Sequence, residues 1–387
     1  MNGFVAGNRI ELLQAGAEYF PALEAACESA EHEIYLETYI FSDDATGRRI
    51  AAALSRAARR GVIVHLMIDG FGSKALGAEF LRALERDGVR VLNYRPQISP
   101  WTLRRERLRR MHRKIAVIDA RVAFVGGINI IDDMHTPGQV PPRFDYAVRV
   151  EGPLLAAIHP VVTRLWMLVM WTQFHRRWKT KSTAVQTPVC GTRSGAFYVR
   201  DNFRHRNDIE SAYLDAIAGA TTDIVIANAY FFPGTSFRRA LADAAARGVR
   251  VVLLLQGRVE YMLLHYASRA LYRFFLDAGV EIYEYHRSFL HAKVAVIDGR
   301  WATVGSSNID PMSLLLAREA NVMIDDAGFA CDLRASLTAA MDLGAQRILP
   351  ARWHHQPLPL RALTWICYEL VRFLTGWSSY GRAGEFR

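Results

Sequence analysis

The sequence predicts an α/β protein built from two similar halves, and three observations lead to this fold class. Apolar runs typical of buried strands alternate with helical segments that end at glycine. The same series of segments occurs twice along the 387 residues. Each series ends in one short polar signature. We therefore expect two pseudo-repeated α/β/α sandwich halves with mixed sheets and one active site at their interface.

The strands and helices of the two halves match one to one. The segment EIYLETYIF (33–41) corresponds to DIVIANAYFF (223–232), and both are apolar and rich in β-branched or aromatic residues. Two helix-then-strand units follow in each half. Their helices end at glycines, Gly61 and Gly88 in the first half and Gly248 and Gly279 in the second.

Changes in composition mark the boundaries of the two halves and of a C-terminal tail. The stretch 175–195 is polar and turn-rich, which predicts a linker between the halves. A Pro-rich segment follows residue 349. We expect a first half at 1–180, a second half at 196–350 and an amphipathic C-terminal tail at 351–387.

The polar signature reads H-x-K-x4-D-x6-G-[GS]-x-N in both halves. Two chance matches to its first part, among 12 histidines, would arise at roughly one in a thousand or less. Its members are His112, Lys114, Asp119, Gly126, Gly127 and Asn129 in the first half and His291, Lys293, Asp298, Gly305, Ser306 and Asn308 in the second.

This pattern suits phosphodiester chemistry. Residues two apart share one strand face, so each histidine points into the site with its lysine. One imidazole can attack phosphorus while the other protonates the leaving alkoxide. The two lysines supply positive charge, so we predict no metal and no other cofactor. The paired glycines and Ser306 are expected to let the backbone approach the substrate, and Asn129 and Asn308 to donate to phosphate.

Carboxylates have two predicted tasks around this site. Asp119 and Asp298 fall on the other strand face from the lysines, so they are expected to brace the fold rather than touch substrate. An imidazole also needs an acceptor for its second nitrogen. Asp145 follows the first signature and Glu319 the second, so Asp145 is assigned to orient His112 and Glu319 to orient His291.

The doubled signature resembles the phospholipase D superfamily. The segments MHRKIAVIDARVAFVGGIN, RFDYAVRVEGP, IANAYFFPG and WATVGSSNIDPMSL narrow the resemblance to bacterial cardiolipin synthases of the short B type, without N-terminal transmembrane helices. The resemblance implies a phosphatidyl group passing through a phosphohistidine to phosphatidylglycerol, with phosphatidylglycerol or phosphatidylethanolamine as donor. It also implies that His112 is the nucleophile and His291 the acid and base.

Two unrepeated segments fit a membrane surface. About 12 extra residues precede His112 and include Arg104 and Arg105, which are expected to attract anionic headgroups by about 1 kcal/mol each; a solvated loop is the alternative. In the tail, an apolar helical face (Leu363, Ile366, Leu370, Phe373, Leu374 and Trp377) predicts an interfacial helix, or one docked on the protein's own core. The apolar segment 154–171 is broken by His159, Pro160 and Arg164, and is expected to pack in the core.

Composition limits the remaining possibilities. A net charge of +10 and a pI near 9.6 favour polyanionic partners. Four scattered cysteines indicate neither a zinc site nor a disulfide framework, and the N-terminus lacks a signal-peptide pattern, so a soluble or peripheral cytoplasmic protein is expected. With the resemblance and the amphipathic tail, we expect a peripheral protein on the cytoplasmic face of the membrane. A nuclease, a hydrolytic phospholipase D and a non-catalytic membrane module are the alternatives, although nucleic acid is not expected as a partner. The oligomeric state is left open.

Overall fold

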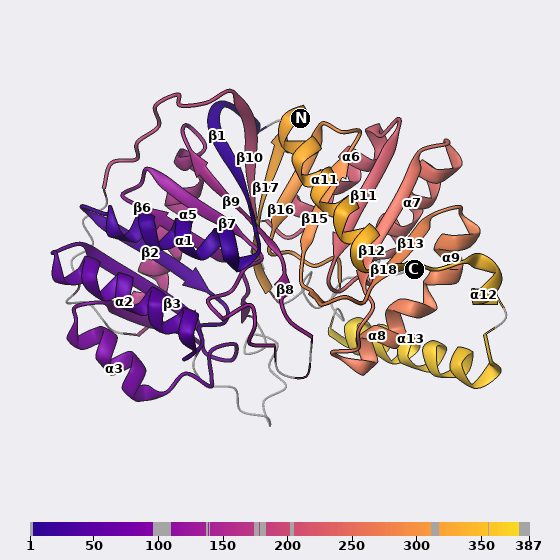
Figure 1. The fold of residues 1–387 in the computed structure, drawn as a ribbon, viewed down its shortest axis with the longest axis horizontal. Helices are drawn as coiled ribbons and strands as arrows, with labels where there is room; N and C mark the ends of the chain where they lie inside the picture. The colour runs from indigo at the N-terminus through magenta and orange to yellow at the C-terminus, as the bar shows by residue number, and fades with distance from the viewer. Residues whose placement is uncertain are drawn as a thin grey trace.

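The computed structural model describes residues 3–95, 110–136, 138, 140–173, 178, 183–201, 205–310, 317–354 and 356–378. Two halves lie side by side, the N-terminal half in indigo and magenta and the C-terminal half in orange and yellow (Figure 1). The predicted α/β class and its two-fold repetition are confirmed. The boundaries proposed at 180, 196 and 350 stay predictions.

The first half alternates strands and helices as its sequence pattern predicts. Its strands are β1 (Val5–Gln14), β2 (Glu33–Thr38), β3 (Ile63–Asp69), β4 (Arg90–Tyr94), β5 (Arg110–Met111), β6 (Lys114–Ile118), β7 (Val122–Gly126), β8 (Arg143–Phe144) and β9 (Tyr146–Glu151). Its helices are α1 (Ala15–Glu28), α2 (Ala45–Arg59), α3 (Ala78–Arg86) and α5 (Leu155–Thr172).

The second half repeats this order and adds two helices at its end. Its strands are β10 (Arg193–Arg200), β11 (Asp223–Asn228), β12 (Arg250–Gln256), β13 (Glu281–Tyr285), β14 (Phe289–Leu290), β15 (Lys293–Ile297), β16 (Trp301–Gly305), β17 (Ala317–Asp325) and β18 (Ala345–Arg347). Its helices are α6 (Asp208–Gly219), α7 (Thr235–Ala246), α8 (Met262–Ala270), α9 (Tyr272–Asp277), α11 (Ala327–Gly344), α12 (Pro350–His354) and α13 (Leu358–Ser378).

The sheets of the two halves form one continuous sheet. Its strand order is β18-β13-β12-β11-β15-β16-β17-β10-β1-β9-β7-β6-β2-β3-β4. Both halves are mixed, because β2 runs parallel to β3 and antiparallel to β6, as β11 does with β12 and β15. Antiparallel pairing of β1 with β10 joins them, so neither half leaves an open sheet edge at the centre.

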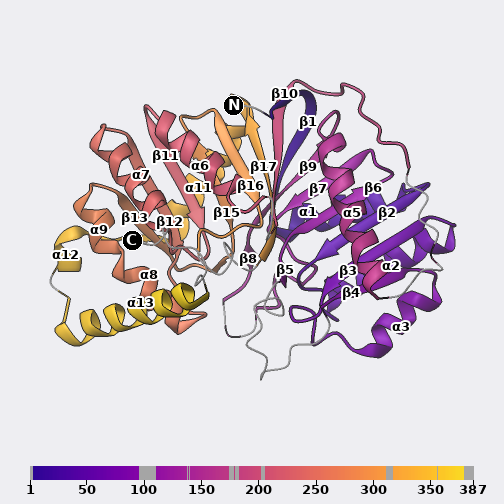
Figure 2. The same cartoon turned by 180° about the vertical axis from the view of Figure 1, so that it is seen from behind.

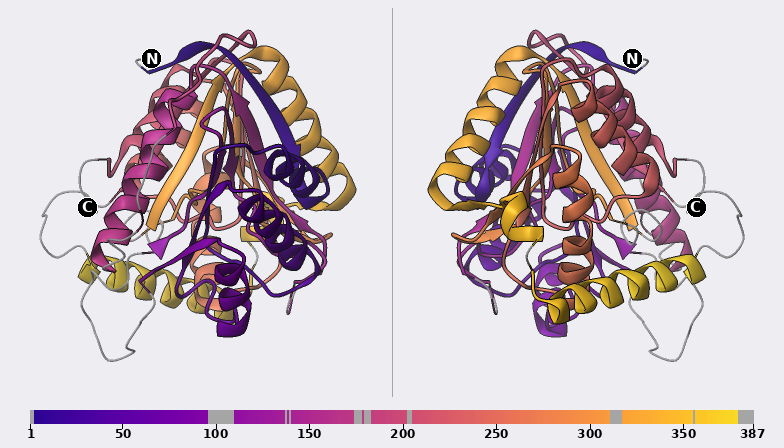
Figure 3. Two further views of the ribbon diagram at one scale, coloured as in Figure 1. Left: turned by 90° about the vertical axis from the view of Figure 1, so that its left-hand side faces the viewer. Right: turned by 90° about the vertical axis from the view of Figure 1, so that its right-hand side faces the viewer.

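Helices cover both faces of this sheet (Figures 2 and 3). Alternation along β2 explains how: Ile34 and Leu36 belong to the buried cluster with α1 and α2, whereas Tyr35 between them belongs to the cluster with α5. By length and composition alone, α5 could cross a membrane. Its buried residues, from Leu155 to Met170, lie in a core that runs through both halves, which confirms the core packing expected for 154–171.

The tail helix α13 docks by a face that was expected to be polar. Tyr368 packs against Phe232 with ring centroids 5.5 Å apart, and Val371 and Thr364 are buried on the same face of α13. The predicted apolar face stays exposed. Its described members, Leu363, Ile366, Leu370, Phe373 and Leu374, are 40–66% exposed and are called the apolar stripe of α13 below.

The signature aspartates brace the fold, as predicted. Asp119 and Asp298 sit in the turns after β6 and β15 with φ near 51°, a left-handed conformation that aspartate tolerates better than most residues. The Asp119 carboxylate accepts backbone hydrogen bonds from residues 31–33 at 2.8–2.9 Å, and that of Asp298 from residues 221–223 at 2.8–3.0 Å. Each carboxylate thereby ties a hairpin to the start of the neighbouring strand.

We expect Asp298→Ala to lower the free energy of unfolding by about 2 kcal/mol, because three backbone donors lose a charged acceptor. Chemical denaturation measures this change, with Asp332→Ala, an exposed aspartate on α11, as the control. Turnover by the fraction of Asp298→Ala protein that is folded should stay near the wild-type value. A variant of full stability without turnover would instead make Asp298 catalytic.

Candidate active site

Short strands that pair across the two halves carry both signature histidines to the site. β5 lies directly before His112 and pairs with β17 of the second half, while β14 lies directly before His291 and pairs with β8 of the first. The His112 backbone N–H donates to the Arg318 carbonyl at 3.0 Å, and that of His291 to the Phe144 carbonyl at 2.8 Å. Each histidine is thus anchored on the backbone of the opposite half.

The carboxylates that orient the histidines cross the interface in the same way. Nδ1 of His112 lies 2.9 Å from Oε1 of Glu319, and Nδ1 of His291 lies 2.6 Å from Oδ2 of Asp145. The sequence-based assignment, Asp145 to His112 and Glu319 to His291, is therefore wrong. Asp145 directly follows β8, which pairs with β14, so strand pairing places it beside His291.

Further hydrogen bonds hold both carboxylates in place. The Ser306 hydroxyl donates to Glu319 and accepts from the Ala320 N–H at 3.1 Å, while Oδ1 of Asp145 accepts from the Tyr146 N–H at 2.8 Å. Both carboxylates are buried. With Nδ1 bonded to a carboxylate, each imidazole keeps Nε2 for reaction.

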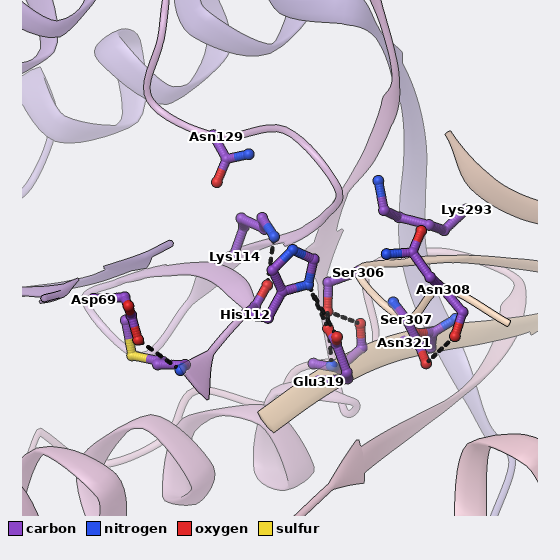
Figure 4. A network of polar contacts seen from close by, with 12 residues as sticks. Asp69, His112, Lys114, Asn129, Lys293, Ser306, Ser307, Asn308, Glu319 and Asn321 are labelled. Carbon is purple, nitrogen blue, oxygen red and sulfur yellow. Dashed lines mark hydrogen bonds and ion pairs between the residues drawn. The ribbon is translucent and has the colours of Figure 1, made fainter. Parts of the chain in front are cut away.

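The lysines and asparagines of the two signatures surround the histidines. Figure 4 shows Lys114 and Asn129 on one side of His112 and Lys293 and Asn308 on the other. Both lysines are at least 97% buried, and each donates to the carbonyl of its own signature histidine. Oδ1 of Asn129 accepts from the Ile40 N–H at 3.1 Å, which leaves its Nδ2 to donate to a substrate oxygen.

Burial dominates the electrostatics of this site. It lowers the pKa of His112, although Glu319 opposes the shift, and it lowers the pKa of His291 well below the ordinary value, with Lys293 adding to the effect. It also raises the pKa of Asp145 to about 6 and lowers the pKa of Lys114 to about 7. Near neutral pH both imidazoles are therefore uncharged and able to act as nucleophile or base.

The small residues predicted to contact substrate through their backbone also have a packing role, while their contact with substrate stays a prediction. A Cβ atom on Gly127 would lie 2.4 Å from the Asp145 carboxylate, and one on Gly126 would lie 2.5 Å from the backbone of the neighbouring strand β9. Gly305 is closed in by Asn321, and Ser306 holds Glu319. These small residues make room for the strands that carry the carboxylates. The two predicted headgroup arginines, Arg104 and Arg105, lie outside the described residues.

Three residues near the site were not predicted from the sequence. The Tyr39 ring packs edge-on against His112 at 4.9 Å, and Asp69 accepts the Met111 N–H at 2.9 Å, which holds β5 in place. Glu260 accepts from the Tyr230 hydroxyl, and burial raises its pKa to about 7 while Arg143 opposes the shift. Tyr39 and Asp69 close the predicted strands of the first half, and their position at those carboxyl ends was the available signal.

The crossed pairing predicts selective changes in histidine titration. Glu319→Gln should lower the pKa of His112 further, because it removes the negative charge that opposes the effect of burial, and should leave His291 nearly unchanged. Asp145→Asn should instead change the pKa of His291 and leave that of His112 nearly unchanged. NMR of histidine-labelled protein, with His112→Ala and His291→Ala for assignment, measures both. If Glu319→Gln changed the pKa of His291 and left the pKa of His112 unchanged, the crossed arrangement would be contradicted.

Comparisons with known proteins identify the family of the chain. The family model described as "Cardiolipin synthase, PLD-like domain" matches residues 23–136 and 213–340, one stretch in each half. Cardiolipin synthase B of Escherichia coli (strain K12) is 41% identical over 342 residues, which cover 88% of this chain and 82% of the relative. The probable cardiolipin synthase YwiE of Bacillus subtilis is 30% identical and is matched over 83% of this chain and 63% of its own length.

Solved structures share the fold at low sequence identity. Phosphatidylserine synthase of Haemophilus influenzae superposes with a TM-score of 0.71 at 13% identity, over 96% of both chains. The polyphosphate kinase of Porphyromonas gingivalis gives a TM-score of 0.57 at 14% identity, over 95% of this chain and 53% of the kinase. With its two matched domains and its paired signature histidines, the chain belongs to the cardiolipin synthase family of phospholipase D-like enzymes.

Proposed function

We propose that this enzyme is a cardiolipin synthase that transfers a phosphatidyl group from phosphatidylglycerol or phosphatidylethanolamine to phosphatidylglycerol, releasing a free alcohol. One observation carries the proposal: two histidines face one site, and each is oriented by a carboxylate from the other half. Such a pair suits a double displacement at phosphorus. The names of the relatives support cardiolipin as the product.

The first displacement forms a covalent intermediate. Nε2 of His112 attacks phosphorus, and the bond from phosphorus to the headgroup oxygen breaks. His291, which takes up a proton once the phosphodiester anion is bound beside it, gives that proton to the oxygen. Glu319 keeps the Nδ1 proton on His112, so the attacking lone pair is on Nε2. The products of this step are a phosphatidyl-histidine and the headgroup alcohol, which is glycerol or ethanolamine.

The second displacement reverses these roles. Neutral His291 takes the proton of a glycerol hydroxyl of phosphatidylglycerol, the hydroxyl oxygen attacks phosphorus, and the bond to His112 breaks. Their environments favour this order. His291 lies beside Lys293 and Arg143, so it releases a proton readily, whereas Glu319 preserves more basicity on His112.

Positive charge for both steps comes from the chain itself. Lys114 and Lys293 are buried beside the histidines, and in a water-poor site their charge acts strongly on phosphate oxygens. The amide groups of Asn129 and Asn308 add neutral donors. We accordingly propose turnover that needs neither a metal ion nor another cofactor.

We place the enzyme at the membrane surface as a peripheral protein on the cytoplasmic face. The apolar stripe of α13 presents five large apolar side chains to solvent, and α13 lies along one edge of the second half (Figure 1). A contiguous exposed apolar surface of this kind is typical of membrane or protein contact. The substrates, being phospholipids, favour the membrane.

The product assay tests the proposed function directly. Purified enzyme is incubated with labelled phosphatidylglycerol, with and without phosphatidylethanolamine and EDTA, and the lipids are separated. We expect cardiolipin and glycerol, with unchanged yield in EDTA. Phosphatidic acid as the sole product would favour a hydrolase, and cleavage of DNA without lipid turnover would favour a nuclease; either outcome would overturn the proposal.

The same assay tests the shared site. His112→Ala and His291→Ala should each reduce turnover by about 10⁴-fold or more while the protein stays folded, because neither histidine can complete the cycle alone. Release of glycerol in a single turnover by His291→Ala, but not by His112→Ala, would fit the proposed order. Full turnover by either variant would refute a shared site.

Turnover should have a narrow pH optimum. Below about pH 6 Asp145 takes up a proton and stops orienting His291, and above about pH 7 Lys114 loses its charge. We therefore expect kcat/KM for detergent-dispersed substrate to fall below about pH 6 and above about pH 7. Lys114→Arg should lower the maximum but shift the upper limit to higher pH, since guanidinium keeps its charge. An unchanged upper limit would exclude Lys114 as its cause.

A further inference from the structure

A groove of about 560 Å³ lies beside α13, apart from the paired histidines. Its walls come from α8 and α9 on one side and from α12 and the first turns of α13 on the other. Figure 1 shows α8, α12 and α13 at the edge of the second half. Each signature histidine, by contrast, follows a short strand that pairs with the opposite half. Among the described residues, no member of the active site lines the groove.

Three arginines line this groove, and none of its described lining residues is acidic. Arg269 is already engaged: it lies 3.2 Å from Glu284 and over the Trp353 ring at 5.1 Å. Arg273 lies 3.6 Å from Asp277, but both side chains are more than half exposed, so their pair adds little. Arg361 makes no ion pair with any residue that the structure describes. The guanidinium groups of Arg273 and Arg361 are therefore available to bind an anion.

The surroundings of these two arginines favour a phospholipid headgroup. Planar guanidinium groups bind phosphate oxygens in pairs of hydrogen bonds. Trp365, on the rim, is 62% exposed, and tryptophan is favoured at the level of lipid headgroups. The apolar stripe lies on the opposite face of α13 from Arg361, so it contacts the membrane separately from the groove.

We propose that this groove binds the phosphate of an anionic phospholipid, with Arg273 and Arg361 as its ligands. The bound lipid lies outside the site of transfer, so it holds the enzyme on the membrane without being turned over. The inference rests on the proposed function only in requiring a membrane surface. It does not require that the product be cardiolipin.

Binding to vesicles tests the groove. At low salt, Arg273→Gln/Arg361→Gln should bind phosphatidylcholine vesicles that contain phosphatidylglycerol roughly thirty-fold more weakly than wild type, for two lost charges near the surface. The matched control is Arg121→Gln/Arg300→Gln, which removes two exposed arginines outside the groove. An equal loss in the control, or no loss in the groove variant, would overturn the proposal.

A charge-conserving variant separates a headgroup site from diffuse attraction. Arg273→Lys/Arg361→Lys keeps the charge but loses the paired hydrogen bonds, so we expect a several-fold loss of vesicle binding. Wild-type binding by this variant would contradict the site. Thermal unfolding and turnover of detergent-dispersed substrate should stay unchanged in all variants. If no protein, wild type included, turns over that substrate, the proposed function fails, while vesicle binding still decides the groove.

Discussion

Backbone pairing between the two halves is the constraint on which the active site depends. The strands β5 and β14 are two residues long, yet each pairs with a strand of the opposite half and directly precedes a signature histidine. The same pairing brings in the carboxylates, so a histidine and its acceptor always come from different halves. One half alone would hold an imidazole without the carboxylate that orients it.

The rest of the fold keeps this pairing in register. Antiparallel β1 and β10 make the sheet continuous, and one buried cluster includes residues of α5 from the first half and α11 from the second. Asp119 and Asp298 tie each signature hairpin to the strand beside it. Rigid strands on both sides of the interface then fix distances of 2.6–2.9 Å between groups distant in sequence.

Small departures from symmetry make the two histidines chemically different. Ser306 donates to Glu319, whereas at the equivalent position Gly127 leaves only enough room for Asp145. His291 also has Lys293 within 2.9 Å of its Nδ1. A nucleophile and a proton donor need different pKa values, and near-identical halves acquire them through these neighbours. Outside the site, α13 and its groove have no equivalent among the described residues of the first half. The repeated halves thus supply the catalytic groups, and the unrepeated part supplies a binding surface.

The sequence by itself determined the α/β class, the repetition, the signature residues and the bracing role of Asp119 and Asp298, because these follow from periodicities and spacings local to the chain. It paired the carboxylates wrongly because it took Asp145, near His112 in sequence, as its partner. Only the tertiary structure decided that pairing, the roles of Gly127 and Ser306, and the exposure of the apolar stripe of α13. These depend on which strands and helices meet across the molecule, and a local pattern is the same whichever neighbour covers it.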